Sequence, residues 1–216
     1  MAGRAKRRWL SWSMSTERSG DPAPDTAESA RLRDAATRLF AVLGYDGTAT
    51  EMIADAAGVP REQVVAAGGR SGLYRQALEE HCREQCLMLE EIGQGFRPGD
   101  DRMAIVLEHL MDFYLARQDL VAMWRQRRMM DAADMTDLEE RYQYPIHQKV
   151  LAILGPDVVE SPEYELIGVV FAWCLLGFTA GGAPRPDGSL LDPDDPRDRA
   201  LFRSHMIELM EKLRSA

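Results

Sequence analysis

The sequence predicts an all-α protein in which a helix-turn-helix unit precedes a larger helical domain. From residue 25 onward, apolar residues recur at spacings of three and four, which is the period of a helix. No segment alternates apolar and polar residues in the way typical of a strand, and no segment repeats another. Three short helices in close succession, with a glycine turn between the second and third, indicate the helix-turn-helix.

Local signals place the first three helices. An apolar stripe over residues 32–43 ends at Gly44. Thr48, followed three residues later by Glu51, predicts a capping box at the start of a second helix that ends at Gly58. Pro60 suits the beginning of a third helix from about Arg61, because a first-turn residue needs no N–H partner.

The remaining helices follow from the same period and from residues that favour helix starts. We expect a long helix ending at Gly93 to Gly95, two middle helices, a helix kinked by Pro145, and two apolar terminal helices. The loop over residues 181–196 is rich in Pro, Gly and Asp and predicts no regular structure. The predicted start signals are Ser71, Asp100 or Asp101, Thr136, Ser161 and Asp195.

Composition excludes several classes of protein. A chain of 216 residues can bury a core without disulfides, and three cysteines are too few for a secreted disulfide framework. We therefore expect a cytoplasmic protein, and we find no apolar run that predicts a membrane span. The net charge of −9 argues against a surface that is basic throughout.

Positive charge concentrates at the amino-terminus. Residues 1–20 carry five basic residues against one acidic residue, and residues 13–24 are rich in Ser, Gly and Pro. We interpret residues 1–24 as a disordered basic arm, either an inert leader or a segment that contacts the DNA backbone or minor groove. Its candidate contact residues are Arg4, Lys6, Arg7 and Arg8.

The run RLRDAATRLFAVLGYDGTATEMIADAAGVP, residues 31–60, resembles the amino-terminal domain of TetR-family transcriptional regulators. The resemblance implies a DNA-binding domain over residues 25–72, whose third helix enters the major groove. It also implies a ligand-binding and dimerisation domain over residues 73–216, with no cofactor and no metal.

The third helix departs from the family pattern. Val65 stands where the family has a phosphate-contacting Tyr, Gly68 replaces an aromatic residue, and no Lys follows Arg70. Residues 31–75 carry six basic and five acidic residues, a weak charge surplus for a DNA reader. Arginine and glutamine still suit guanine and adenine edges. The candidate DNA-binding residues are Thr48, Arg61, Glu62, Gln63 and Arg70.

The resemblance also assigns roles to the larger domain. Met and aromatic side chains of the middle helices predict a cavity for a small apolar or aromatic ligand, although the same stripe is typical of an ordinary core. Its candidate residues are His109, Phe113, Trp124, Arg128, Met129, Tyr142 and Trp173. The family packs its last two helices as a four-helix dimer interface, and the candidate interface residues here are Phe178, Phe202, Met206, Leu209, Met210 and Leu213.

Three hypotheses follow. The first is a homodimeric regulator of double-stranded DNA, a repressor released by its ligand. The second is a ligand- or protein-binding module of the same fold that has lost sequence-specific DNA binding. The third is an all-helical enzyme, for which only an aromatic cavity with nearby histidines and cysteines argues. Cys82 and Cys86 lie four residues apart, but no second ligand pair accompanies them at metal-site spacing, so neither a metal site nor catalysis is expected.

Overall fold

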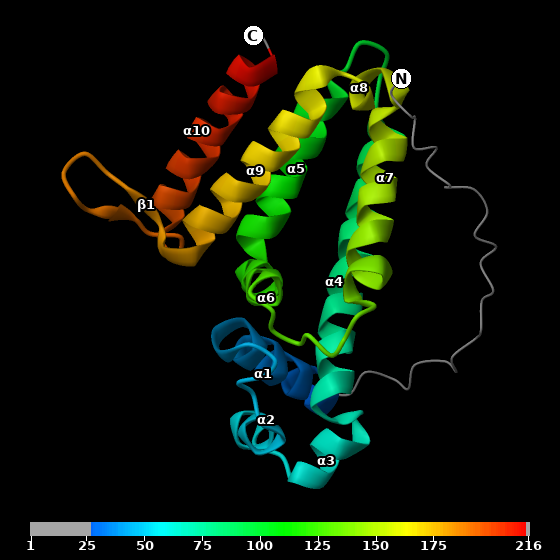
Figure 1. Ribbon diagram of the computed structural model, residues 1–216, viewed down its shortest axis with the longest axis vertical. Helices are drawn as coiled ribbons and strands as arrows, with labels where there is room; N and C mark the ends of the chain where they lie inside the picture. The colour runs from blue at the N-terminus through cyan, green and yellow to red at the C-terminus, as the bar shows by residue number, and fades with distance from the viewer. Residues whose placement is uncertain (1–26, 215–216) are drawn as a thin grey trace, which may run out of the picture.

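The computed structural model describes residues 27–214, and these residues form a helical protein with one small hairpin (Figure 1). The predicted basic arm, residues 1–24, lies outside the described residues. The elements are α1 (Ala27–Leu43), α2 (Thr50–Ala57), α3 (Arg61–Ala66), α4 (Gly69–Gly95), α5 (Arg102–Ala116), α6 (Gln118–Arg128), a π-helical turn (Glu139–Gln143), α7 (Tyr144–Leu154), α8 (Pro156–Val159), α9 (Pro162–Gly181), β1 (Ala183–Pro184), β2 (Leu190–Leu191) and α10 (Pro196–Arg214).

The helices α1, α2 and α3 form a helix-turn-helix unit at one end of the molecule (Figure 1). Its core gathers buried apolar residues of all three helices around Phe40, whose ring contacts the rings of Tyr45 and Tyr74 edge-on or tilted. Gly58 ends α2 in the left-handed conformation, at φ 66°, as the sequence predicts. Aromatic pairs in such geometry stabilise a small core beyond simple burial.

The predicted capping box at Thr48 is wrong. α2 begins two residues later, after Ala49, and no side chain caps it. The Thr48 side chain is fully buried, and its hydroxyl donates 2.6 Å to the carbonyl of Gly44. Thr48 therefore closes the turn after α1 instead of capping α2.

The long helix α4 runs from the helix-turn-helix into the larger domain, where it packs on α5 and α7 (Figure 1). The core of that domain lies between α4, α5, α9 and α10. Phe178 of α9 and Phe202 of α10 stack at its centre, with ring centroids 4.0 Å apart. One helix is thus shared by both parts of the chain, so a movement of the upper part of α4 must reach α3.

Two elements differ from the sequence prediction. Pro145 does not kink a continuous helix but lies in the first turn of α7, directly after a π-helical turn, because a first-turn proline loses no hydrogen bond. The loop over residues 181–196 contains the β1–β2 pair, in which Ala183 faces Leu191. Asp198 of α10 holds this hairpin by accepting bonds from the Arg185 guanidinium and the Asp192 N–H.

The outer face of α9 is apolar. Leu166, Val169 and Trp173 lie on it at helical spacing, and Trp173 is 70% exposed in the single chain. The stretch Glu163–Gly181 is also long and apolar enough to cross a membrane, with a mean hydropathy of 1.6 and 22% of it buried. This corrects the expectation that no such run exists. A buried face and an exposed apolar face together produce that composition.

Candidate DNA-binding face and ligand cavity

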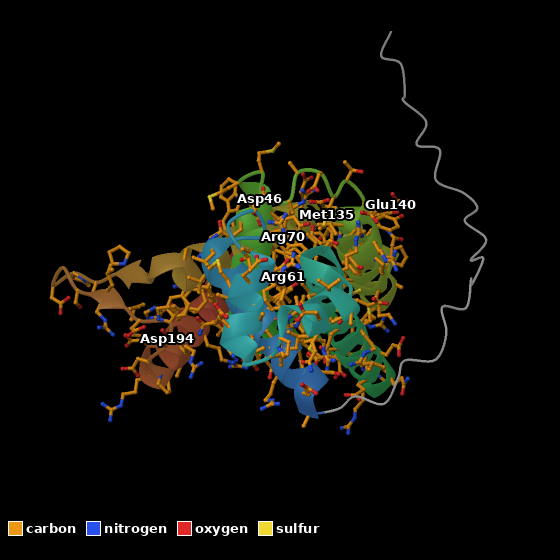
Figure 2. The ribbon with its side chains drawn as sticks, turned by 90° about the horizontal axis from the view of Figure 1, so that it is seen from below. Asp46, Arg61, Arg70, Met135, Glu140 and Asp194 are labelled. Carbon is orange, nitrogen blue, oxygen red and sulfur yellow. The ribbon has the colours of Figure 1, made fainter. Side chains whose placement is uncertain are left out.

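The candidate DNA-binding face is the end of the molecule formed by α2 and α3, viewed in Figure 2. Arg61, Glu62 and Gln63 in the first turn of α3 are exposed, so their side chains are accessible to a nucleic acid. Arg61 donates from Nε to Glu51 of α2 at 2.6 Å, and both side chains are more than half exposed. The pKa of Glu51 is lowered by backbone hydrogen bonding and by Arg61. The Arg61 guanidinium is thus held in place by α2.

Arg70 has a structural role that the sequence does not reveal. Its Nη1 donates 3.2 Å to the carbonyl of Thr48, and its guanidinium carbon lies 4.1 Å from the centroid of the Tyr45 ring. Because Arg70 lies in the first turn of α4, these contacts hold the start of α4 against the turn between α1 and α2. Thr48, which is buried, offers no atom to DNA in this structure.

α3 extends from Arg61 to Ala66, and two glycines follow it closely. Gly68 and Gly69 adopt φ of 99° and 68°, a region that L-residues other than glycine rarely occupy. Val65 lies on the exposed side of the helix. The exposed polar side chains of α3 all belong to its first turn.

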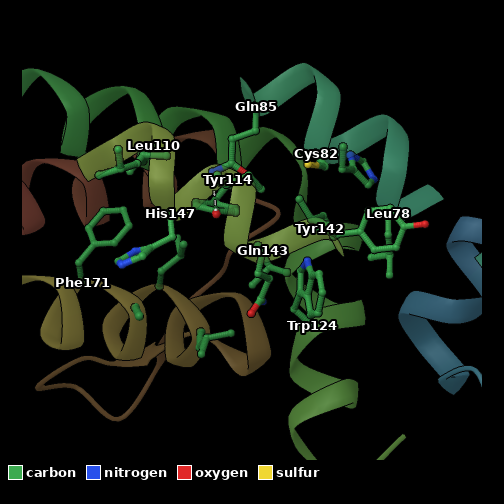
Figure 3. Close-up of a pocket in the computed structure, with 18 of the residues that line it drawn as sticks. Leu78, Cys82, Gln85, Leu110, Tyr114, Trp124, Tyr142, Gln143, His147 and Phe171 are labelled. Atoms are coloured by element: carbon green, nitrogen blue, oxygen red, sulfur yellow. Dashed lines mark hydrogen bonds between the residues drawn. The ribbon is translucent and has the colours of Figure 1, made fainter. Parts of the chain in front are cut away.

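The larger domain contains a cavity of about 300 Å³ bounded by α4, α5, α6, α7 and α9 (Figure 3). Its wall is mainly aliphatic and aromatic, which is typical of sites for small apolar ligands. Arg128 and His147 line it and are exposed, so charge is confined to side chains that reach solvent. The lining residues are Leu78, His81, Cys82, Gln85, Leu110, Tyr114, Leu120, Val121, Trp124, Arg128, Tyr142, Gln143, Ile146, His147, Val150, Phe171, Ala172, Leu175 and Leu176.

One polar pair crosses the apolar wall. Gln85 of α4 donates from Nε2 to the hydroxyl of Tyr114 of α5 at 2.8 Å, the bond that Figure 3 marks between them. Gln85 is 1% exposed, and its Oε1 has no hydrogen-bond partner among residues 27–214. Burial raises the pKa of Tyr114, so its hydroxyl stays protonated at neutral pH.

Burial also shifts the pKa of His81 and of Cys82. It lowers the pKa of His81, which is therefore neutral at pH 7, and Nδ1 of this ring has no partner in the described part of the chain. Burial and the neighbouring Cys86 thiol raise the pKa of Cys82. A thiol with a raised pKa is a poor nucleophile and a poor metal ligand.

The predicted ligand residues separate into two groups. Trp124, Arg128 and Tyr142 line the cavity. Phe113 lies outside the cavity and packs against the core around Phe40. The side chains of His109, Met129 and Trp173 are exposed away from the cavity. Trp173 lies on the outer face of α9 because the inner face is occupied by Phe171, Leu175 and Phe178. Helical period alone does not say which of two apolar faces is turned inward.

Gln85 was not among the predicted site residues. The sequence does distinguish it, because it is a polar residue within the apolar stripe of the long fourth helix, where a solvated side chain is not expected. The α9 residues of the wall carried no such signal, because every position near them is apolar.

A carboxylate joins the cavity domain to the helix-turn-helix. Asp131, in the loop after α6, accepts hydrogen bonds from the N–H of Tyr45 at 2.7 Å and of Asp46 at 2.8 Å. Asp46 in turn accepts from the N–H of Ala132 at 3.2 Å. We call these four residues the Asp131 clamp. Gly44 precedes it, and a Cβ there would lie 2.9 Å from the Asp131 carboxylate.

Arg127 holds the loop that carries the clamp. Its guanidinium donates to the carbonyls of Asp131, Ala132 and Met135 and to the carboxylate of Glu139. Met130 and Ala132 adopt φ of 72° and 54°, which costs on the order of 1 kcal/mol or more for residues other than glycine. Such a backbone persists only where its surroundings fix it, and here Arg127 does so.

The predicted interface residues lie mainly inside the single chain. Four of the six are buried in the core of the larger domain, namely Phe178, Phe202, Met206 and Met210. The other two, Leu209 and Leu213, are partly buried against that core. Four of the six thus fill the core of the single chain, and the assignment of this set to a dimer interface stays a prediction. The inward face of α10 fills the chain's own core because α9 and the hairpin pack on it.

Comparison with known proteins supports this reading of the fold. Residues 32–64 match the family model for bacterial regulatory proteins of the tetR family. No protein of curated function matches the sequence of the chain.

Solved structures of similar fold cover most of the chain. The fatty acid degradation regulator FadR from Bacillus halodurans is 11% identical, over 87% of this chain and 96% of its own, with a TM-score of 0.57. A putative TetR-family regulator from Mesorhizobium loti is 17% identical over 88% and 97%, with a TM-score of 0.56. A TetR-like regulator from Rhodococcus sp. RHA1 is 16% identical over 88% and 99%, with a TM-score of 0.53.

At these identities the solved structures establish the fold, while the matched helix-turn-helix carries the family signature. Residues 32–64 thus match the helix-turn-helix of the tetR family of bacterial regulatory proteins, and the chain shares its overall fold with these solved structures.

Proposed function

We propose that the protein is a homodimeric, cytoplasmic repressor that leaves its operator when a small, mainly apolar molecule enters the cavity between α4 and α9. The observation that carries this proposal is the cavity itself. It is apolar, about 300 Å³ in volume, and crossed by a buried amide that lacks one partner. A buried acceptor without a partner costs about 1–3 kcal/mol, which a ligand donor would relieve.

The Asp131 clamp supplies the route from the cavity to DNA. Trp124 and Arg128 of α6 line the cavity, and α6 continues through Arg127 into the loop that holds Asp131. α6 also packs along α1. A ligand that shifts α6 therefore acts directly on the turn that orients α2 and α3. Because coupling is reciprocal, DNA and ligand weaken each other's binding by the same factor.

The outer face of α9 is the proposed dimer surface. Leu166, Val169 and Trp173 form a continuous exposed apolar stripe, and Leu201 of α10 adds a further exposed apolar side chain. Large exposed apolar patches mark association surfaces. A twofold dimer across this face would present two helix-turn-helix units to successive major grooves, about 34–36 Å apart in the simplest geometry.

A second candidate has its own support. The short α3, the exposed Val65 and the pairing of Arg61 with Glu51 all reduce the contacts available to DNA. They favour a module of the same fold that binds a ligand or a protein and has weak sequence preference. Retained binding to a cognate duplex separates the two candidates.

The test begins with the full-length protein and duplexes from the DNA flanking its own gene, at a stated salt concentration. A regulator binds one of these duplexes more tightly than a scrambled duplex of the same length, by the 10³-fold or more typical of specific sites. Compounds are then screened for release of the bound duplex, followed by fluorescence anisotropy. Equal affinity for cognate and scrambled duplexes would select the second candidate.

A further inference from the structure

The strongest unexplained feature of the molecule is the Gln85–Tyr114 pair inside the cavity. The pair uses one amide hydrogen and one hydroxyl lone pair. The amide oxygen and the second amide hydrogen of Gln85 and the hydroxyl hydrogen of Tyr114 are left, and no other hydrogen bond in the described residues engages them. Both groups face apolar walls, in which an unmet donor or acceptor is costly.

The unmet pair does not depend on how the amide is oriented. If the amide is turned over, the Tyr114 hydroxyl donates to the amide oxygen, and both amide hydrogens and the hydroxyl lone pair are left instead. In either orientation the pair presents at least one donor and one acceptor side by side. A ligand group that both accepts and donates therefore engages an unmet donor and an unmet acceptor of the pair together.

Charge in the wall argues for an uncharged ligand group. His81 is half-buried and neutral, and the cationic side chain of the wall, Arg128, is exposed. An ionised carboxylate placed at the Gln85–Tyr114 pair would be desolvated without a counter-charge beside it, which is strongly unfavourable. A carboxylate that turned outward to Arg128 would leave the pair unmet.

Resting on the proposed ligand response, we infer that the cavity selects a neutral amphiphile, an apolar body bearing one group that donates and accepts, such as an alcohol, a phenol or an amide, seated on the Gln85–Tyr114 pair. The apolar body lies against Leu110, Phe171 and Leu175, which line the cavity beside the pair. The polar group exchanges its hydrogen bonds with water for two bonds within the site.

Three probes of equal chain length test the inference by calorimetric titration of the full-length protein. They are 1-octanol, which donates and accepts; heptyl methyl ether, which only accepts; and octanoate, which is anionic at pH 7. The parent is expected to bind 1-octanol about tenfold more tightly than either of the others, in line with the cost of one unmet buried group. Gln85→Met, of similar volume, should bring the affinities for 1-octanol and heptyl methyl ether together.

Two further variants keep the outcome unambiguous. Tyr114→Phe should also reduce the preference for 1-octanol, which provides a second reading if Gln85→Met unfolds. Met129→Leu, at a side chain exposed away from the cavity, should keep the preference. Octanoate binding that equals or exceeds that of 1-octanol and is lost in Arg128→Gln would overturn the inference, as would equal binding of all three probes by the parent.

The inference and the proposed function fail differently. Equal binding of the probes together with release of DNA refutes the inference and leaves the ligand response standing. Selective binding of 1-octanol without release of DNA supports the inference and refutes the response. Binding of none of the three refutes the cavity as a ligand site and both statements with it.

Discussion

Replacing Asp131 by alanine removes the carboxylate that joins the cavity domain to the helix-turn-helix. The substitution deletes two hydrogen bonds, from the N–H groups of Tyr45 and Asp46. It leaves Arg127 bound to the loop carbonyls and to Glu139, so the loop itself should stay folded. We expect a folded protein in which ligand binding no longer weakens DNA binding.

The magnitude follows from the two bonds. A hydrogen bond to a charged acceptor contributes about 1.5–3 kcal/mol, and Asp131 is partly exposed, so water replaces part of that. We expect a loss of about 2–3 kcal/mol in the free energy of unfolding. For a chain of this size, each kcal/mol lowers Tm by about 2–4 °C, which gives a fall of about 4–12 °C. Asp131→Asn keeps one carboxamide oxygen as an acceptor and should lose roughly half as much.

The coupling is measured as the factor by which a ligand weakens DNA binding. In the parent this factor should lie between about 5 and 150, the usual range for 1–3 kcal/mol of coupling. In Asp131→Ala it should approach one while ligand affinity in the absence of DNA is retained. Asp134→Ala, at an exposed carboxylate in the same loop, is the matched control. An unchanged Tm with an unchanged coupling factor in Asp131→Ala would refute the role of the clamp.

Three further predictions concern association, pH and salt. Trp173→Glu should place a charge on the apolar face of α9 and convert a dimer into monomers by light scattering at micromolar concentration; a monomeric parent would contradict the dimer. The Arg75 guanidinium, in two hydrogen bonds, lowers the pKa of Asp137, so this pair stabilises the fold above the unfolded pKa, near 4, and the gain is lost as pH falls through the folded pKa. Asp137→Asn should therefore flatten the fall of Tm below about pH 4, and an identical profile would argue against it. Deleting residues 1–13 should reduce the salt slope of DNA binding by up to about three or four if the arm engages, whereas Arg61→Ala should reduce base preference by about 1–3 kcal/mol on a cognate duplex alone; an unchanged slope would exclude the arm.

The sequence by itself determined the fold class and the helix-turn-helix. The apolar period and local start and stop signals act over a few residues. The end of α2 at Gly58 and the start of α3 at Arg61 therefore follow from neighbouring residues. The Asp101 cap of α5 also follows, since its carboxylate accepts from the N–H of Ala104 three residues on.

Only the tertiary structure decided what each residue does. Thr48 and Arg70, both expected to contact DNA, are instead held at the turn after α1. Thr48 bonds to Gly44 within this turn, and Arg70 bonds to Thr48 from α4, which meets the turn only on folding. Trp173 and Phe178 are both apolar residues of one helix, yet one is exposed and the other stacks on Phe202. A helix that is apolar on two faces does not encode which face the rest of the chain will cover.

The cavity and the clamp also depend on contacts distant in sequence. Gln85 meets Tyr114 across 29 residues, and Asp131 meets Tyr45 across 86. No local pattern specifies such pairs, because their geometry is set by how α4, α5 and α6 pack. Gln85 can be recognised in the sequence because it is a polar residue in an apolar stripe. Nothing in the sequence distinguishes Asp131, since an aspartate in a loop is ordinarily solvated.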